Sequence, residues 1–217
     1  MIERVLPADV AVFETRGDLQ EALFPVEATA IGSAVDKRRR EFVTGRACAR
    51  RALGQLGFPR CAVPIGPRGA PVWPHGAVGS LTHCAGFRAA AAARVEDYRS
   101  LGIDAEADAA LPEGVLEVVA LPDEREHLDA LALTDPGTCW DRILFSAKES
   151  VFKAWFPLAQ AWLGFEDAAL VIEPTAGTFS ARLLVPGPVI GSRPLHGFTG
   201  RWARDQGIVV TGVAVPI

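Results

Sequence analysis

The chain reads SLGIDAE at residues 100–106 and FSAKESVFK at residues 145–153, and these two stretches constrain its fold most. In a β-strand successive side chains point to opposite faces, so the first stretch would place Asp104 and Glu106 on one face. The second stretch lies in a helical pattern over residues 140–156. The sequence therefore predicts a strand with two carboxylates, followed by a helix with a glutamate and two lysines.

Helical and strand patterns occur on both sides of these stretches. We expect a strand and loops over residues 1–35 and a Pro- and Gly-rich loop over 61–78. A helix is expected over 36–56, and a helical block over 111–132 that is split near residue 121. Further strands are expected over 79–84, 87–95, 98–106, 168–172, 179–185, 198–203 and 207–215. Pro157 is expected to end the helix over 140–156. The alanine run at 89–93 would also suit a helix by propensity. A boundary near residue 100 would divide the chain almost equally.

The composition excludes several classes of protein. The 217 residues are 49% apolar and 22% charged, which is typical of a globular protein with a packed core. No apolar run approaches the roughly 20 residues of a membrane span, and charges interrupt the N-terminal stretch, unlike a signal peptide. The net charge of −4 argues against a dedicated nucleic-acid binder. The four cysteines form no C-x-x-C pair, so we expect small buried side chains and no zinc or redox site. The sequence predicts a soluble, cytoplasmic protein.

Asp104 and Glu106 form the first candidate site. Two carboxylates about 7 Å apart on one strand face repel each other unless water or a cation lies between them. Oxygen ligands of this kind suit Mg²⁺, which commonly takes one or two protein carboxylates together with substrate phosphates. A solvated strand end is the alternative interpretation.

Glu149 and Lys153 form the second candidate site. They are separated by one helical turn and can touch, so an exposed salt bridge is the ordinary interpretation. Phe145 and Phe152 flank Glu149 with aromatic surface, and two of the three lysines in the chain occur within this segment. A carboxylate and an ammonium beside an apolar wall can act as a general base and a phosphate-neutralising cation.

Two further segments offer contacts to phosphate. The helix over 36–56 is rich in basic residues in an otherwise acidic chain, and Arg46 on it could bind phosphate through two nitrogens. A solvated helix surface is the alternative. Thr82 and His83 follow a glycine and could hold a phosphate oxygen, although a single histidine is more often structural. Because no Walker, Rossmann or G-x-S-x-G motif occurs, the combined set points to chemistry on a phosphate or pyrophosphate ester.

The order and spacing of these residues resemble a known signature. Residues 102–106 followed by 145–154 are similar to the (V/I)GxDxE…(F/W)(S/C)xKE(S/A)xxK motif of the 4′-phosphopantetheinyl transferases. The basic helix, Trp73-Pro74 and residues 79–84 resemble the actinobacterial, enterobactin-synthetase-related branch of the Sfp-type enzymes. The resemblance extends from about residue 20 to the C-terminus. It implies an α+β fold and a monomer of two similar subdomains, 1–103 and 104–217, related by a pseudo-two-fold with coenzyme A between them.

The resemblance also implies a reaction. The 4′-phosphopantetheine arm of coenzyme A would move to a serine of an apo acyl or peptidyl carrier protein, and adenosine 3′,5′-bisphosphate would leave. By motif position, Mg²⁺ would be held by Asp104, Glu106, Glu149 and the Ala105 carbonyl. Glu149 would be the base for the carrier serine, directly or through a bound water. Lys153 would neutralise the pyrophosphate and protonate the departing nucleotide.

The remaining coenzyme A contacts follow from the same resemblance. The expected phosphate contacts are Arg38, Arg46, Thr82 and His83, with Lys148 as a further candidate. The loop that should lie along the nucleotide comprises Ile65, Gly66, Pro67 and Arg68. Relatives often carry a lysine where this chain has Ile65, and Arg68 is expected to replace its charge.

Two other functions fit the same residues. A Mg²⁺-dependent nuclease or phosphodiesterase also uses D-x-E…E-x-x-x-K, although the acidic net charge counts against it. A non-catalytic module that binds coenzyme A or a carrier would not need intact Asp104, Glu106, Glu149 and Lys153. The carrier is not encoded in any motif: fatty-acid, polyketide and peptide synthetases all fit. We expect residues 111–119 and the aromatic run over 155–165 to form its docking surface.

Overall fold

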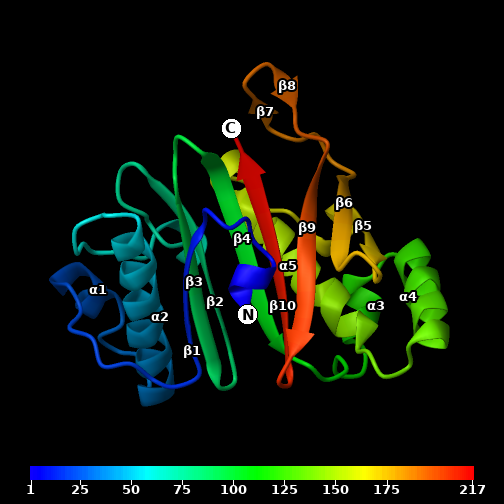
Figure 1. Ribbon diagram of the computed structural model, residues 1–217, viewed down its shortest axis with the longest axis horizontal. Helices are drawn as coiled ribbons and strands as arrows, with labels where there is room; N and C mark the ends of the chain where they lie inside the picture. The colour runs from blue at the N-terminus through cyan, green and yellow to red at the C-terminus, as the bar shows by residue number, and fades with distance from the viewer.

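The computed structural model describes residues 1–217 and contains two main antiparallel sheets, with helices packed on them (Figure 1). The first sheet has the strand order β1-β3-β2 and comprises β1 (Ala11–Thr15), β2 (Ala77–Cys84) and β3 (Phe87–Arg94). The second has the order β4-β10-β9-β6-β5 and comprises β4 (Tyr98–Ala107), β5 (Ala168–Glu173), β6 (Thr178–Leu183), β9 (Gly197–Asp205) and β10 (Ile208–Pro216). A small hairpin, β7 (Val189–Ile190) and β8 (Arg193–Pro194), projects beyond the second sheet (Figure 1).

The helix α2 (Asp36–Gln55) packs on the first sheet, as its apolar stripe predicts. Ala49, Ala52 and Leu53 of α2 lie in one cluster with Ala90 and Ala92 of β3. The alanine run at 89–93 is therefore strand, although it also suits a helix by propensity. Pairing with β1 on one side and β2 on the other decides its conformation.

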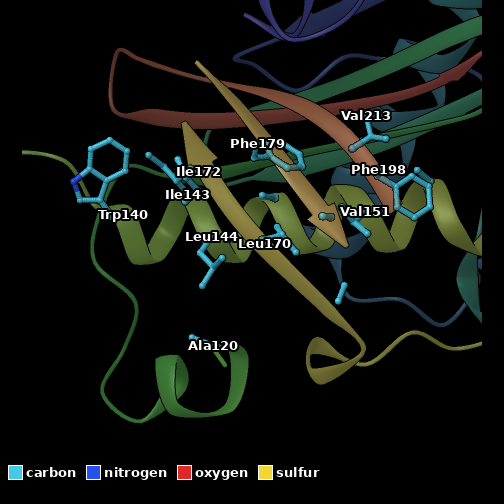
Figure 2. Close-up of a cluster of buried hydrophobic side chains, with 14 of the residues drawn as sticks. Ala120, Trp140, Ile143, Leu144, Val151, Leu170, Ile172, Phe179, Phe198 and Val213 are labelled. Carbon is cyan, nitrogen blue, oxygen red and sulfur yellow. The ribbon is translucent and has the colours of Figure 1, made fainter. Parts of the chain in front are cut away.

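The long helix α5 (Trp140–Ala159) lies across one face of the second sheet (Figure 1). Figure 2 shows its apolar side, with Ile143, Leu144 and Val151, against side chains of β5, β6, β9 and β10. The helix approaches β4 very closely at Gly102, where a Cβ atom would lie 1.9 Å from the Ser150 carbonyl oxygen. Only a glycine permits this approach, which brings the polar side of α5 to the acidic strand.

The helical block predicted over 111–132 is split as expected, into α3 (Val115–Val119) and α4 (Pro122–Thr134). The prediction that Pro157 ends its helix is wrong, because Pro157 lies inside α5 and the helix continues to Ala159. In the last turn a proline removes one backbone hydrogen bond without breaking the whole helix. The short helix α1 (Pro25–Ala30) and three 3₁₀ turns, Ile2–Arg4, Pro67–Gly69 and Phe165–Asp167, were not predicted.

The mixture of helices and strands fits the expected α+β class. The pseudo-two-fold stays a prediction, and so does the division into 1–103 and 104–217, a boundary that falls inside β4. Of the cysteines only Cys48 is fully buried, so the expectation of four buried side chains is too general. No helix has both the length and the apolar character that crossing a bilayer requires.

Candidate active site

Asp104 of β4 and Lys153 of α5 form the centre of the candidate site. The Lys153 Nζ donates to Asp104 Oδ1 at 2.7 Å and to the Ile103 carbonyl at 3.0 Å. Lys153 forms no ion pair with Glu149, so the ordinary interpretation of that segment as a helix salt bridge is wrong. The reason is the close packing of α5 on β4, which offers Lys153 a buried carboxylate on another element.

The Asp104 side chain is only half-satisfied. Its residue is 5% exposed, and Oδ1 accepts hydrogen bonds from Lys153 and from the Thr82 hydroxyl at 3.3 Å. Its other oxygen, Oδ2, is buried and has no partner in the protein. Buried carboxylate oxygens without a donor are rare, because leaving them unpaired costs free energy. Asp104 is therefore not the solvated strand end that the sequence left open, and its Oδ2 is available to a cation.

Glu106 pairs with a residue that the sequence analysis missed. Arg142 of α5 donates to Glu106 Oε2 at 3.0 Å, and its other nitrogens donate to the carbonyls of Ala109 and Ala110. Burial raises the pKa of Glu106, and the charge of Asp104 raises it further, while Arg142 opposes the shift. Arg142 precedes Glu149 by seven residues, which places both side chains on one side of the helix. This spacing could have identified Arg142 as a residue of the site.

Glu149 differs from the other two carboxylates because it has no hydrogen-bond or ion-pair partner in the structure. Burial raises the pKa of Glu149; the Lys153 charge lowers it and the Asp104 charge raises it again. A carboxylate with a raised pKa is a stronger base than an ordinary glutamate. Its free oxygens and its environment both suit proton abstraction.

The three carboxylates lie in one electrostatic neighbourhood without forming a complete metal centre. Asp104 contributes to the raised pKa of both Glu106 and Glu149, so the three side chains are near enough to repel one another. No three acidic, histidine or cysteine side chains converge into a complete metal centre. This arrangement suits Mg²⁺, which keeps water and substrate phosphate in its shell, and the unpartnered Asp104 Oδ2 is the donor that it would use. The Ala105 carbonyl as a further ligand stays a prediction.

Arg46 is the strongest candidate for an anion contact in the first half of the chain. It is 6% exposed, stacks on the Phe42 ring at 4.1 Å, and its Nε has no partner. Burial lowers the pKa of Arg46 to about 10, and the nearby cations Arg50 and Arg38 add to this effect against the charge of Glu27. A buried guanidinium with an unused donor and cationic neighbours is suited to a phosphate group.

His83 connects this region with the acidic strand. Its Nε2 lies 3.5 Å from Glu41, and burial lowers its pKa, against the effect of the Glu41 charge. Arg38 and Lys153 also lower the pKa of His83, so they lie in its electrostatic neighbourhood. Arg38 of α2 and Lys153 of α5 therefore lie near the His83 imidazole of β2, while the phosphate contacts expected for these residues stay predictions.

Lys148 lies apart from this group. Its Nζ donates to the carbonyls of Phe165 and Ala168, at 2.6 and 3.0 Å, and forms a buried ion pair with Glu124 at 2.8 Å. All three ammonium hydrogens are thus used, and Lys148 joins α4, α5 and β5. The sequence suggested a coenzyme A contact, whereas the structure gives Lys148 a role in packing.

The loop over 65–68 reaches the second half of the chain. Ile65 pairs with Pro71 in a single bridge, and Gly66 and Pro67 lead into the turn. Arg68 adopts a left-handed backbone, with φ 54°, and its guanidinium lies 6.0 Å from the Trp162 ring. The charge that the sequence assigned to this loop is therefore present beside an aromatic side chain.

An apolar hollow of about 210 Å³ adjoins Glu149. It lies between α5 and the segment that follows it, and its aromatic wall includes Phe152, Trp162 and Phe165. The rings of Phe152 and Trp162 are 4.9 Å apart. The hollow provides an apolar surface next to the free carboxylate.

Comparison with known proteins gives matches along nearly the whole chain. Residues 26–93 match the 4′-phosphopantetheinyl transferase N-terminal domain, and residues 100–204 match the 4′-phosphopantetheinyl transferase superfamily. Three similar relatives are the 4′-phosphopantetheinyl transferases Svp of Streptomyces mobaraensis, Npt of Nocardia iowensis and PptT of Mycobacterium tuberculosis. They are 56%, 49% and 45% identical, each over 99% of this chain, and the matches cover 89%, 99% and 98% of the relatives.

Proposed function

The chain belongs to the 4′-phosphopantetheinyl transferase superfamily, and from this premise we propose that its reaction takes place where β4 and α5 face the cations of α2 and β2. The chain is an enzyme that transfers the phosphopantetheine arm of coenzyme A to carrier proteins. An oxygen–phosphorus bond forms to the carrier serine as the pyrophosphate bond breaks, and adenosine 3′,5′-bisphosphate leaves.

The observation that carries the assignment is the Asp104 carboxylate, with Lys153 on Oδ1 and no partner on Oδ2. We assign Mg²⁺ to Asp104, Glu106 and Glu149, with the Ala105 carbonyl as a further ligand. A bound Mg²⁺ would supply positive charge to the pyrophosphate. Lys153 adds a second charge from the side of α5, and it is the proposed proton donor to the departing nucleotide.

Glu149 is the proposed base. A serine hydroxyl is a weak nucleophile and needs a group that accepts its proton during attack. Glu149 has free oxygens, a raised pKa and a place beside the apolar hollow. It accepts the serine proton, directly or through a bound water, while the hollow receives the apolar part of the pantetheine arm.

The nucleotide end of coenzyme A is assigned to the cations of the first half. Arg46, Arg38 and His83 contact its phosphates, and the loop over 65–68 lies along it. Thr82 and Lys148 already use their hydrogen-bond donors inside the protein, so we do not assign phosphate contacts to their side chains.

The proposed acceptors are apo acyl or peptidyl carrier proteins, modified in the cytoplasm by a monomeric enzyme. Two exposed apolar side chains support the expected docking surface, Val118 of α3 at 73% exposed and Trp162 at 61% exposed. They belong to the two segments, 111–119 and 155–165, that the sequence analysis assigned to the carrier.

Mass spectrometry of an apo carrier protein tests the proposal. Incubation with enzyme, coenzyme A and Mg²⁺ should add one phosphopantetheine group to the carrier serine, and chelation of Mg²⁺ should prevent it. Asp104→Asn should abolish the mass increase, whereas Glu173→Gln, at an exposed position of β5, should not. Coenzyme A binding without any mass increase would support a non-catalytic module, and cleavage of added DNA would support a nuclease.

A further inference from the structure

The two main sheets meet along β2 and β4 without a backbone ladder. No backbone hydrogen bond joins these strands. Instead, two β4 amides donate to side-chain hydroxyls of β2: Ile103 N–H to Ser80 Oγ at 3.0 Å, and Ala105 N–H to Thr82 Oγ1 at 2.9 Å. We call this pair of hydroxyls the hydroxyl seam. Because residues 80 and 82 bond to 103 and 105 in turn, the two strands run in the same direction.

The two hydroxyls of the seam differ in one respect. A hydroxyl has one hydrogen and can also accept hydrogen bonds. Thr82 accepts from the Ala105 amide and donates its own hydrogen to Asp104 Oδ1 at 3.3 Å. Ser80 forms the matching bond to Ile103 and makes no hydrogen bond to Asp104. Thr82 is thus the one side chain of β2 that bonds to the acidic centre.

This contact fixes the orientation of the Asp104 carboxylate. Oδ1 receives two donors from different directions, the Lys153 ammonium and the Thr82 hydroxyl. Both Thr82 and Asp104 are 5% exposed, so water does not readily replace either bond. With Oδ1 held by two donors, Oδ2 is the oxygen left for another ligand.

We propose that Thr82 is a positioning residue that orients Asp104 for its cation across the hydroxyl seam. This inference rests on the proposed function, in which Asp104 holds Mg²⁺. Groups that hydrogen-bond to a metal ligand typically change metal affinity by about 10- to 100-fold when they are removed. Since His83 follows Thr82 on β2, one strand carries both the contact to Asp104 and a proposed phosphate contact.

Three variants separate this role from a purely structural one. Thr82→Val removes the hydroxyl at constant shape, Thr82→Ser keeps it, and Ser80→Ala removes the other half of the seam. Mg²⁺ binding is measured calorimetrically with coenzyme A present and the carrier absent, so that no turnover occurs. The thermal unfolding midpoint is measured on the same samples.

We expect Thr82→Val and Ser80→Ala to lower the unfolding midpoint to a similar extent, because each leaves one buried amide unpaired. Only Thr82→Val should weaken Mg²⁺ binding, by about 10-fold, and Thr82→Ser should restore it. Thr82→Ala replaces the valine variant if that protein does not fold.

Equal weakening of Mg²⁺ binding in Thr82→Val and Ser80→Ala would overturn the proposal, since the seam would then act only on the fold. Unchanged affinity in Thr82→Val would overturn it as well. The variant Asp104→Asn separates these results from a failure of the proposed function: if it also leaves Mg²⁺ binding unchanged, Asp104 is not a ligand at all.

Discussion

Lys148 and Lys153 lie five residues apart on α5, on different faces of the helix, and their partners give them different tasks. Lys148 is 4% exposed and bound to Glu124 and two carbonyls, whereas Lys153 reaches Asp104 at the candidate site. The sequence marks both as unusual in a chain with few lysines, but it contains no sign of which helix face is buried against another helix. The pairs Lys148–Glu124 and Glu106–Arg142 join residues far apart in sequence, so no local pattern reveals them.

Replacing Lys148 with Met should therefore affect folding more than catalysis. The change leaves Glu124, which is 3% exposed, without its cation, and breaking such a buried pair costs about 3–5 kcal/mol. Urea unfolding measures the loss, and the double variant Lys148→Met/Glu124→Gln should recover part of it. A large loss of coenzyme A affinity at unchanged stability would instead make Lys148 a ligand contact.

Replacing Glu149 with Gln should separate chemistry from binding. The variant keeps the shape of the side chain but cannot accept the serine proton, so kcat should fall by about 10²–10⁴. Coenzyme A affinity should fall much less than kcat, because Arg46, Arg38 and His83 are assigned to the nucleotide phosphates and Lys153 to the pyrophosphate. The test measures kcat with saturating carrier and the dissociation constant of coenzyme A for the variant and the parent enzyme. A nearly unchanged kcat would show that another group is the base.

The same variant has a predicted effect on stability. A glutamate whose pKa is raised by folding contributes stability below its ordinary pKa, and this is lost as the pH rises through the raised value. Without metal, the parent enzyme should therefore lose stability between acidic and neutral pH more than Glu149→Gln does. Thermal unfolding across this range in the presence of a chelator measures the difference, and parallel curves would contradict the raised pKa.

The contact between α5 and β4 is the element-scale feature on which the candidate site depends. Gly102→Ala would place a Cβ atom 1.9 Å from the Ser150 carbonyl, so the helix must move away from the strand. We expect a loss of at least 1–3 kcal/mol, as in other overpacked cores, together with loss of activity. Gly45→Ala, inside α2 with no atom within 4 Å of its new Cβ, is the control and should stabilise by about 0.5–1 kcal/mol. If Gly102→Ala and Gly45→Ala were equally stable, α5 would be able to move away from β4 at no cost in free energy.

At this scale the sequence predicts long periodic elements well and short ones poorly. The helices α2 and α5 and most strands follow from their apolar patterns, and the split between α3 and α4 follows from a proline. The hairpin of β7 and β8 is missed because two-residue strands have no period to detect. The sequence predicts the end of α5 too early, because local propensity alone favours a helix end at Pro157, whereas the structure keeps this proline in the last helical turn.

Over the whole molecule, the proposed coenzyme A contacts come from both halves of the chain. A ligand that binds only the folded state adds about 2.7 kcal/mol of stability at 100 times its Kd. For a protein of this size each kcal/mol raises the melting temperature by about 2–4 °C. Coenzyme A and Mg²⁺ together should therefore raise the melting temperature of this protein by several degrees, which is more than either ligand alone should do.

The variant Arg46→Ala should reduce this shift, whereas Arg51→Ala should not, because Arg51 stacks on Phe13 and no phosphate contact is assigned to it. Differential scanning calorimetry with each ligand combination provides the measurement. The same shift in both arginine variants would indicate that α2 attracts the nucleotide through diffuse charge alone.

The meeting of β2 and β4 has a consequence for the behaviour of the protein in a crowded solution. Each main sheet has two outer strands, β1 and β2 in one sheet and β4 and β5 in the other. Outer strands expose unpaired amides and carbonyls, through which proteins aggregate. By turning β2 and β4 toward each other, with hydroxyls in place of a ladder, the chain conceals half of these edges from other molecules. Since β4 follows β3 directly along the chain, the strand that covers the edge of β2 is also close to it in sequence.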